Sequence, residues 1–334
     1  MTDRLHEIFE VEDHDVHTVC TAYDLGDPVA WASCGGGLVN SNYRLDTAKG
    51  AFLLRCYPAE RRKEEVTFEL SLLTHLDETG FFGPTPVRAA SGEYIGTLRG
   101  RLFSVLTFVE GDTVTQAELT SDLAAQVGEK YAHFRRVVQG FRPLGEREDA
   151  DHPAVSALIG PLLDDITADH PDEARLIKAA WNDVEERFRS VDEDRLQVVH
   201  GDLFYENVIV RDGRLLTFID YDDAYLGLPL LDLALVVMEF ATPEDNRLDP
   251  GLAGAVLRAY VAASEEPPAT PEELLDALVF LCCKFMAYTL PLNLQRGESI
   301  ADNDYLRRLA LLRDDAVRRE LERAFAAELT GEGA

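Results

Sequence analysis

Apolar and polar residues alternate from residue 29 to residue 57, as they do in β-strands that bury one face. The strand-like runs are "VAWASC", "LVNSNYRLD" and "AFLLRCYP", with a turn near Lys49 and Gly50 between the last two. Two more runs of this kind follow near "EYIGTL" and "RLFSVLTFV". The first two runs are separated by the glycines Gly35, Gly36 and Gly37. The pattern predicts a small antiparallel sheet with a glycine-rich hairpin close to its start.

A helical period replaces this alternation from Arg62 to Thr79, and Gly80 is a suitable residue to end the helix. The segment "EGDTV", residues 110 to 114, then leads into a chain whose pattern is mostly helical. We expect helices at about 115–139, 152–168, 172–190, 230–241, 249–264, 272–290 and 303–329. The predicted fold is α+β, with a sheet-containing N-lobe over residues 1–110 and a helical C-lobe over residues 111–334.

One stretch of the C-lobe, "VVHGDLFYENVIV" at residues 198 to 210, interrupts two apolar runs with polar side chains. These side chains are His200, Asp202, Glu206 and Asn207. A single Asp or Asn at such a place is most often a turn or cap residue. The joint pattern favours a functional loop instead: "HGD" is followed by four residues, an Asn, and then a "DG" hairpin that ends in "FID".

The dipeptide "DG" at residues 212 and 213 lies between two strand-like runs and predicts a two-residue hairpin turn. Pairing that continues from this turn puts Asn207 opposite Phe218 and Asp220 opposite Tyr205. Asn207 and Asp220 are then diagonal neighbours on one face, about 7 to 8 Å apart at Cα. The register predicts that an amide oxygen and a carboxylate converge on one point.

Such oxygen ligands suit Mg²⁺, which binds a few protein oxygens together with the phosphates of a substrate. Asp202 precedes Asn207 by five residues, where it could accept a hydroxyl proton or orient the hydroxyl toward a phosphorus atom. His200 is expected to brace the loop by hydrogen bonds rather than to act as the base. The candidate chemistry is phosphoryl transfer to a hydroxyl group.

The N-lobe offers a candidate binding site for the phosphates of the donor. Backbone N–H groups of the glycine-rich hairpin could approach phosphates closely, although three glycines can also mark a mobile turn. Arg55 lies in an apolar strand, and Glu69 lies on the apolar face of the following helix. Buried charges need partners, so we expect an ion pair between them that faces phosphates. A purely internal ion pair is the alternative.

Charge and cysteine content limit the partners and the location. The 32 basic and 61 acidic residues give a net charge of −29, which repels nucleic acid and anionic membranes. Adaptation to high salt and attraction of a cationic substrate are both compatible with this charge. The five cysteines are odd in number and mostly lie in apolar contexts, as reduced, buried thiols do. The start is acidic and no run approaches the length of a membrane helix, so we expect a cytoplasmic protein.

The motifs of both lobes resemble those of the aminoglycoside phosphotransferase and choline kinase superfamily, most strongly in "HGDLFYENV" and "FIDYDDA". The resemblance implies a protein-kinase-like two-lobed fold that uses ATP and Mg²⁺, with a nucleotide-binding N-lobe and a C-lobe that holds the catalytic loop and the substrate pocket. It implies that Asp202 is the catalytic residue, that Asn207 and Asp220 bind the metal, and that Asp232 supports the loop together with His200. The implied nucleotide contacts are Gly35, Gly36, Gly37, Asn40, Ser41, Asn42, Arg55, Glu69, and the hinge residues Phe108 and Glu110.

Within this superfamily, "GGGLVNSNYRLDTAKGAFLLRCYP" and "HGDLF" look most like homoserine kinases of this fold, whereas "FIDYDDA" is closer to other hydroxyl kinases. Arg55 stands where the wider kinase pattern has Lys. The implied function is phosphorylation of a small hydroxyl metabolite, with L-homoserine as the first candidate. Choline, hydroxylysine, a methylthioribose-like sugar and an aminoglycoside are alternative acceptors. A nucleotide-binding regulator without turnover is the alternative from a different class.

Overall fold

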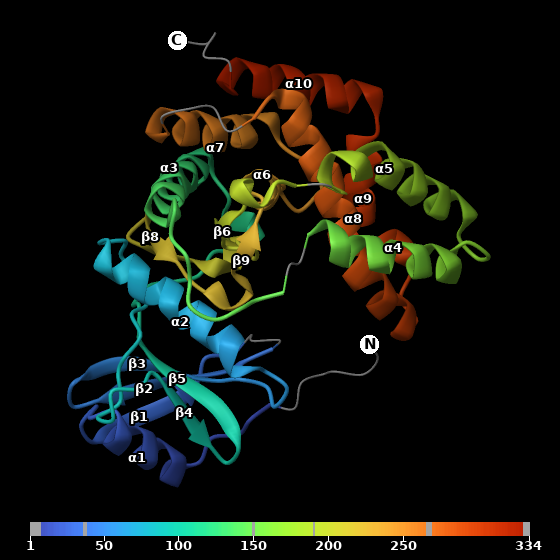
Figure 1. Ribbon diagram of the computed structural model, residues 1–334. Helices are drawn as coiled ribbons and strands as arrows, with labels where there is room; N and C mark the ends of the chain where they lie inside the picture. Colours follow the sequence, from blue (N-terminus) through green and yellow to red (C-terminus); the bar gives the residue numbers. More distant parts are fainter. Residues whose placement is uncertain (1–7, 36–38, 149–150, 190, 265–268, 330–334) are drawn as a thin grey trace. The chain divides into compact units, whose positions relative to one another are not determined.

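The computed structural model describes residues 8–35, 39–148, 151–189, 191–264 and 269–329 (Figure 1). The chain divides into two compact units. The first consists of Met1–Gly111 with Arg142–Arg147, and the second of Asp112–Phe141 with Glu148–Ala334. No sequence pattern indicated that the short segment Arg142–Arg147 belongs to the first unit. Each unit has its own core and is described separately below.

The first unit is built on a five-stranded antiparallel sheet of order β1-β2-β3-β5-β4. Its strands are β1 (Pro28–Ser33), β2 (Ser41–Thr47), β3 (Gly50–Cys56), β4 (Ile95–Leu98) and β5 (Arg101–Thr107). The helix between β3 and β4 is α2 (Lys63–Glu78). The strands and this helix confirm the predicted elements. The helix α1 (Asp13–Ala22) was not predicted from the sequence, because few apolar residues mark its buried face and one buried residue is the carboxylate Asp15.

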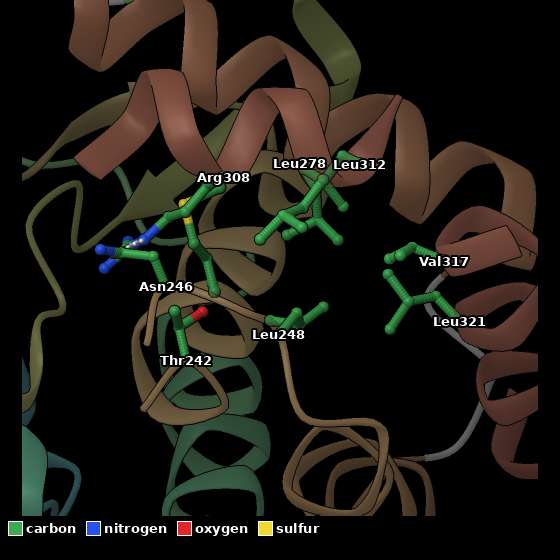
Figure 2. Close-up of a pocket in the computed structure, with 10 residues that line it drawn as sticks. Thr242, Asn246, Leu248, Leu278, Arg308, Leu312, Val317 and Leu321 are labelled. Carbon is green, nitrogen blue, oxygen red and sulfur yellow. Dashed lines mark hydrogen bonds between the residues drawn. The ribbon is translucent and has the colours of Figure 1, made fainter. Parts of the chain in front are cut away.

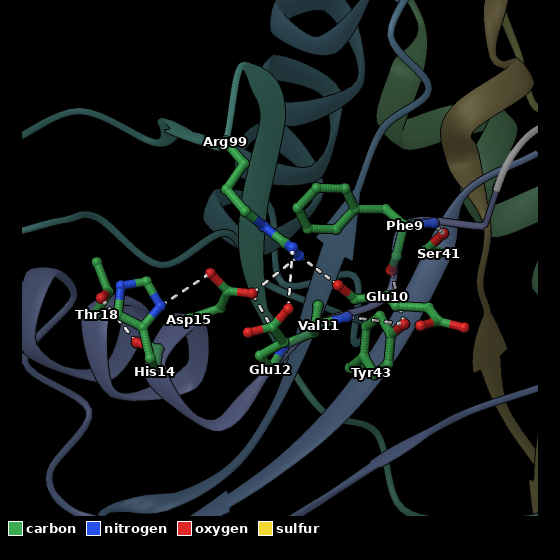
Figure 3. Close-up of polar contacts among 10 residues, drawn as sticks. All are labelled: Phe9, Glu10, Val11, Glu12, His14, Asp15, Thr18, Ser41, Tyr43 and Arg99. Atoms are coloured by element: carbon green, nitrogen blue, oxygen red, sulfur yellow. Dashed lines mark hydrogen bonds and ion pairs between the residues drawn. The ribbon is translucent and has the colours of Figure 1, made fainter.

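Polar contacts fix the N-terminal segment to the sheet (Figure 3). The Phe9 N–H donates to Ser41 Oγ at 2.9 Å, and the Tyr43 hydroxyl donates to the Phe9 carbonyl oxygen at 2.7 Å. Arg99 lies 4.3 Å above the Phe9 ring and contacts the buried Asp15 carboxylate at 2.9 Å. The buried carboxylate is thus compensated by a cation.

The second unit is mostly helical and contains two small antiparallel ladders. Strand β6 pairs with β9, and β7 pairs with β8. Its elements are α3 (Ser121–Val138), α4 (His152–Ile166), α5 (Pro171–Arg189), β6 (Gln197–Val199), β7 (Val208–Arg211), β8 (Arg214–Phe218), β9 (Tyr225–Gly227), α6 (Pro229–Phe240), α7 (Pro250–Ala263), α8 (Pro271–Gln295), α9 (Asp304–Leu312) and α10 (Asp315–Leu329).

The boundaries of three predicted helices were wrong. The helix expected from residue 115 begins at Ser121, where the Thr120 side chain caps it by accepting the Leu123 N–H. The helix expected to end at residue 290 continues to Gln295. The expected helix 303–329 is two helices, because the Asp314 carboxylate accepts the N–H groups of Ala316 and Val317 and starts a new helix there.

Helix α8 corrects the expectation that no segment approaches a membrane span. By length and composition, Pro271–Gln295 is apolar enough to cross a membrane, with a mean hydropathy of 1.6 over its best 18-residue window. However, 72% of that window is buried inside the structure, where α8 packs against α4, α5, α6, α9 and α10. Burial against these five helices explains an apolar sequence equally well, so α8 is a core helix of this unit.

A small apolar cavity lies among the helices of the second unit (Figure 2). Its volume is about 10 Å³, which is room for a single water molecule. Thr242, Asn246 and Arg308 stand at its polar end, and the rest of its wall is made of Met238, Leu248, Leu278, Leu311, Leu312, Val317 and Leu321. This cavity is a packing defect that is too small to hold a metabolite.

Helix α3 packs so closely on α7 that the contact requires a glycine. A Cβ atom on Gly128 would lie 2.1 Å from the Val256 carbonyl oxygen. We expect Gly128→Ala to lower the free energy of unfolding by about 1 to 3 kcal/mol, because one of the two helices must move. Denaturant titration measures this change.

Gly254 of α7 is the matched control, since the nearest atoms to an added Cβ there belong to the flexible side chains of Glu328, at 3.4 Å, and Arg258, at 3.9 Å. Gly254→Ala should leave stability unchanged or raise it by up to about 1 kcal/mol through helix propensity. Equal destabilisation by both substitutions would contradict the proposed cause.

Candidate active site

The loop after β6 has a shape that depends on one glycine. Gly201 has φ +78°, and an added Cβ would lie 2.5 Å from the Asp223 carbonyl oxygen and 3.0 Å from the Tyr225 ring. The chain therefore turns sharply between His200 and Asp202, and only glycine fits at the turn. The following residues form the short 3-10 turn Tyr205–Asn207, which leads into β7.

A buried carboxylate holds the start of this loop. Asp232 in the first turn of α6 accepts the N–H of His200 at 3.0 Å and the N–H of Gly201 at 2.9 Å. The Tyr131 hydroxyl of α3 donates to the same carboxylate at 3.0 Å. The Asp232 side chain is 3% exposed, so its charge needs these donors, and the loop needs their common acceptor.

His200 is fully buried and braces the loop from its other side. Its Nε2 lies 3.0 Å from the Ile219 carbonyl oxygen, which can only accept, so this nitrogen carries the proton. Nδ1 then accepts the Asp202 N–H at 3.4 Å. Burial lowers the pKa of His200, which keeps the imidazole neutral. The ring also packs against Tyr221 and Phe218, so it has no access to a substrate.

Asn207 and Asp202 are joined by hydrogen bonds. The Asn207 Nδ2 amide donates to the Asp202 carbonyl oxygen at 2.7 Å and to the Asp202 carboxylate at 3.0 Å. Both amide hydrogens are used, because both partners are acceptors. The amide oxygen of Asn207 is therefore left to bind a different partner. An oxygen of this kind is the type of ligand that a hard cation prefers.

The predicted strand register near this site was wrong. Arg211 pairs with Arg214 as expected, but an irregularity between Ile209 and Val210 shifts the pairing by one residue. Val208 consequently lies opposite Phe218, and the Ile219 N–H bonds to the Asn207 carbonyl oxygen at 2.9 Å. Asn207 thus faces Ile219 instead of Phe218, and Asp220 follows at the start of a 3-10 turn, with φ +63°.

Carboxylates gather around Asp202. Burial raises the pKa of Asp202 well above its ordinary value, and the charges of Asp223 and Asp220 raise it further. Carboxylates that repel one another in this way form a site that a divalent cation would stabilise. Among the described residues, no three His, Cys, Asp or Glu side chains form a metal-binding group. Asn207 and Asp220 thus remain metal ligands predicted from the sequence.

A buried polar cluster supports the same loop from behind. Tyr225, whose ring packs on Gly201, donates its hydroxyl to Asp151. Lys284 of α8 lies 3.2 Å from the Tyr225 hydroxyl and 3.4 Å from the Asp151 carboxylate. These three residues were not predicted from the sequence, because no local spacing connects them.

In the first unit the predicted ion pair is present. Arg55 of β3 bonds to Glu69 of α2 at 2.6 Å, and both side chains are buried. Arg55 Nε also donates to the Asn42 amide oxygen at 3.2 Å. The Tyr57 hydroxyl lies 2.8 Å from the second Glu69 oxygen and 2.9 Å from the Ser104 hydroxyl. The pair is therefore fixed from three strands, because Asn42, Arg55 and Ser104 are cross-strand neighbours.

Other residues predicted to contact a nucleotide have different surroundings. Ser41 holds the N-terminal segment through Phe9, and Asn40 is buried. Gly35 is exposed with φ +68°, whereas Gly36 and Gly37 lie outside the described residues.

Phe108 and Glu110, the two residues predicted to form the hinge, are joined by an arginine that was not selected from the sequence. Arg44 lies 4.5 Å above the Phe108 ring and contacts the Glu110 carboxylate at 2.7 Å. Tyr57, Ser104 and Tyr131 were also missed, although a tyrosine on the strand face of Arg55 was a usable signal.

The Asp232 contacts generate a stability prediction. Asp232→Ala should lower the free energy of unfolding by about 3 to 5 kcal/mol, because it leaves buried loop N–H groups without an acceptor. Tyr131→Phe should cost about 1 to 2 kcal/mol, because the carboxylate keeps its two backbone donors. Denaturant titration of both variants tests this order. Equal losses would show that the loop does not depend on the carboxylate.

Comparison with known proteins agrees with this geometry. Residues 31–275 match the model of the phosphotransferase enzyme family, APH. The homoserine kinase of Bradyrhizobium diazoefficiens is 30% identical over 255 residues, which cover 71% of this chain and 72% of that protein. The homoserine kinase of Beijerinckia indica is 27% identical over 336 residues, which cover 93% and 97%.

Solved structures show the same fold at low sequence identity. The amicoumacin kinase hAmiN, in complex with AMP-PNP, Ca²⁺ and Ami, has a TM-score of 0.67 at 16% identity and is covered to 93%, as is this chain. Spectinomycin phosphotransferase APH(9)-Ia, in complex with ADP and spectinomycin, has a TM-score of 0.63 at 14% identity, with 96% of this chain and 99% of that chain covered. The predicted protein-kinase-like fold is confirmed, and the chain belongs to the phosphotransferase enzyme family.

Proposed function

We propose that this protein is an ATP- and Mg²⁺-dependent kinase that phosphorylates the hydroxyl group of L-homoserine. The observation that carries the proposal is the arrangement of Asp202 and Asn207 on one loop. Two hydrogen bonds from the Asn207 NH₂ group fix Asp202 and leave the amide oxygen of Asn207 to accept another partner. The same loop is held by Asp232, so the geometry exists before any ligand binds.

In this proposal, Asn207 and Asp220 hold Mg²⁺, and Arg55 contacts the phosphates of ATP. The ion, when bound, supplies positive charge that stabilises the transferring phosphoryl group. Arg55 keeps its geometry through Glu69 and Asn42. The nucleotide contacts predicted from the sequence, which include the glycine-rich hairpin and the hinge pair Phe108 and Glu110, remain part of the proposal.

Asp202 acts on the acceptor. Its carboxylate orients the substrate hydroxyl and accepts its proton as the bond to phosphorus forms. Asp223 is close enough to raise the pKa of Asp202, and it is exposed. A carboxylate at this place suits the ammonium group of an amino acid or another amine. Homoserine carries both the amine and the hydroxyl.

The curated relatives support homoserine as the acceptor. Relatives named homoserine kinase align over 71 to 93% of this chain at 26 to 30% identity. The second candidate is a more strongly cationic amino alcohol, such as an aminoglycoside, choline or hydroxylysine. The specific observation in its favour is the group of carboxylates around Asp202. A cytoplasmic location is part of the proposal and fits the cysteines, which are free thiols and, except for Cys34, buried.

The acceptor is identified by a substrate panel. Purified protein with ATP and Mg²⁺ should release ADP when L-homoserine is added, and much less with choline, hydroxylysine, methylthioribose or an aminoglycoside. Turnover should require the divalent ion and stop when a chelator removes it. A cationic acceptor should bind more weakly as salt rises, whereas zwitterionic homoserine should change little. Turnover of another acceptor alone would replace homoserine in the proposal.

Asp202→Asn separates a kinase from a regulator that only binds nucleotide. We expect kcat to fall by roughly 10² to 10⁴-fold, because the base is lost, while the Kd for ATP changes little. Asp212→Asn is the matched control, since Asp212 lies at the exposed hairpin turn of the same ladder with φ +53°. Unchanged turnover in Asp202→Asn would exclude the proposed role.

Asp223→Asn tests how the amine is recognised. The KM for homoserine should rise several-fold because an ion pair with the ammonium group is lost, while the KM for ATP should stay the same. Steady-state kinetics with each substrate varied in turn measures the two values. A rise in the KM for ATP alone would place Asp223 on the nucleotide side.

A further inference from the structure

A hollow with a basic wall lies in the second unit, apart from the residues of the candidate active site. Its volume is about 350 Å³, the size of sites that bind small metabolites. Helix α3 contributes Ala132, Arg135, Arg136 and the following Gln139, and the remaining wall is Gln197 of β6 with Ala263 and Ser264 at the end of α7. None of these residues has a role in the proposed reaction.

The polar groups of this wall are mainly hydrogen-bond donors. Arg135 donates to the Gln197 side-chain oxygen at 3.0 Å, which leaves the Gln197 NH₂ group to donate elsewhere. The Nε atom of Arg135 is buried and makes no hydrogen bond within the described part of the chain. Arg136 is exposed and donates to the Ala263 carbonyl oxygen at 3.4 Å. A wall of donors with spare capacity fits a ligand that accepts hydrogen bonds.

The charge of this wall is opposite to that of the protein. The chain has a net charge of −29, yet no carboxylate is among the described residues that line the hollow. Burial lowers the pKa of the neighbouring His133, and the charges of Arg136 and Lys130 lower it further. Two positively charged side chains, Arg135 and Arg136, thus face the hollow, and the described lining residues include no carboxylate to neutralise them. In an acidic protein, such a place concentrates small anions rather than cations.

The hollow is connected to the catalytic loop at two points. Arg135 lies one helical turn after Tyr131, which donates to Asp232, the acceptor for the loop N–H groups. Gln197, which accepts from Arg135, opens β6, the strand that ends just before His200. A ligand that breaks the hydrogen bond between Arg135 and Gln197 would therefore change the support of the loop both through Tyr131 and through β6.

We propose that this hollow is a regulatory site for a small organic anion that carries a phosphate or a carboxylate group. The guanidinium groups of Arg135 and Arg136 bind the anionic group, and Gln197 and Gln139 complete the contacts. Occupancy changes the order of the loop that starts at His200. This inference goes beyond the proposed function and does not depend on which acceptor the kinase uses.

Binding is tested by calorimetric titration of the full-length protein at constant ionic strength, without acceptor or nucleotide. Inorganic phosphate and succinate are the two probes, so that the stronger binder identifies the anionic group. Arg136→Gln should weaken binding of the preferred probe by about tenfold or more, because a charge-assisted hydrogen bond is lost. Arg136 is exposed, so the variant should keep its melting temperature. Arg319→Gln, which removes an exposed arginine of α10, should bind like the unmodified protein.

The regulatory role is tested by hydrogen exchange of the backbone N–H groups of residues 197–203, with and without the preferred probe. The N–H groups of His200 and Gly201 should exchange at least several-fold more slowly or faster when the probe is bound, and Arg136→Gln should abolish the change. Equal weakening of binding in Arg136→Gln and Arg319→Gln would overturn the site. Binding that leaves both loop exchange and turnover unchanged would overturn its regulatory role.

Discussion

The carboxylate of Asp232 is the interaction on which the candidate active site depends. It accepts two consecutive backbone N–H groups of the loop and the hydroxyl of Tyr131. A buried carboxylate without donors would be very costly, and so would buried loop N–H groups without an acceptor. The loop N–H groups supply the donors that the carboxylate needs, and the carboxylate supplies the acceptor that the N–H groups need. These hydrogen bonds connect α3 and α6 to the loop after β6. The network therefore also fixes the positions of Asp202 and Asn207, which lie on that loop.

The first unit uses the same solution for Arg55. A buried guanidinium pairs with Glu69, and the second oxygen of Glu69 is satisfied by Tyr57, which in turn contacts Ser104. A buried ion pair adds little net stability by itself, since desolvation opposes the attraction between the charges. Its value lies in position, because a cation fixed from several strands can bind phosphate without further ordering. Arginine preserves the charge at this place but has a planar group that bonds to two partners at once.

Around Asp202, by contrast, neighbouring carboxylates repel one another. Burial and the charges of Asp223 and Asp220 raise the pKa of Asp202. The ionised carboxylate therefore destabilises the folded protein at neutral pH. Proteins accumulate such repulsion where a ligand will relieve it. A divalent cation and an amine would each do so here. The hollow beside Arg135 is lined by two arginines, so the anion that we propose there would bind in the same unit as the proposed cation.

Most of the elements, and the residue types of the candidate site, could be predicted from the sequence. Hydrophobic period located the sheet and the helices, and the "HGD", Asn and "FID" pattern selected Asp202, Asn207 and Asp220. Unusual charges in apolar segments led to the Arg55 and Glu69 pair. These features are local, or depend on one residue type in an unexpected place, so a linear pattern records them.

Tertiary structure alone decided the rest. The one-residue shift in the β7 and β8 pairing could not be derived, because an irregular ladder depends on packing beneath it rather than on the turn that starts it. The contact of Tyr131 with Asp232 and the cluster of Asp151, Tyr225 and Lys284 join residues far apart in the chain. Helix α1 likewise has a distant partner, because its buried Asp15 pairs with Arg99. Helix α8 has the composition of a membrane span, and only its burial among other helices shows that its apolar residues form part of the protein core. Such features arise when distant segments share one interior, where burial decides which partners each polar group must find.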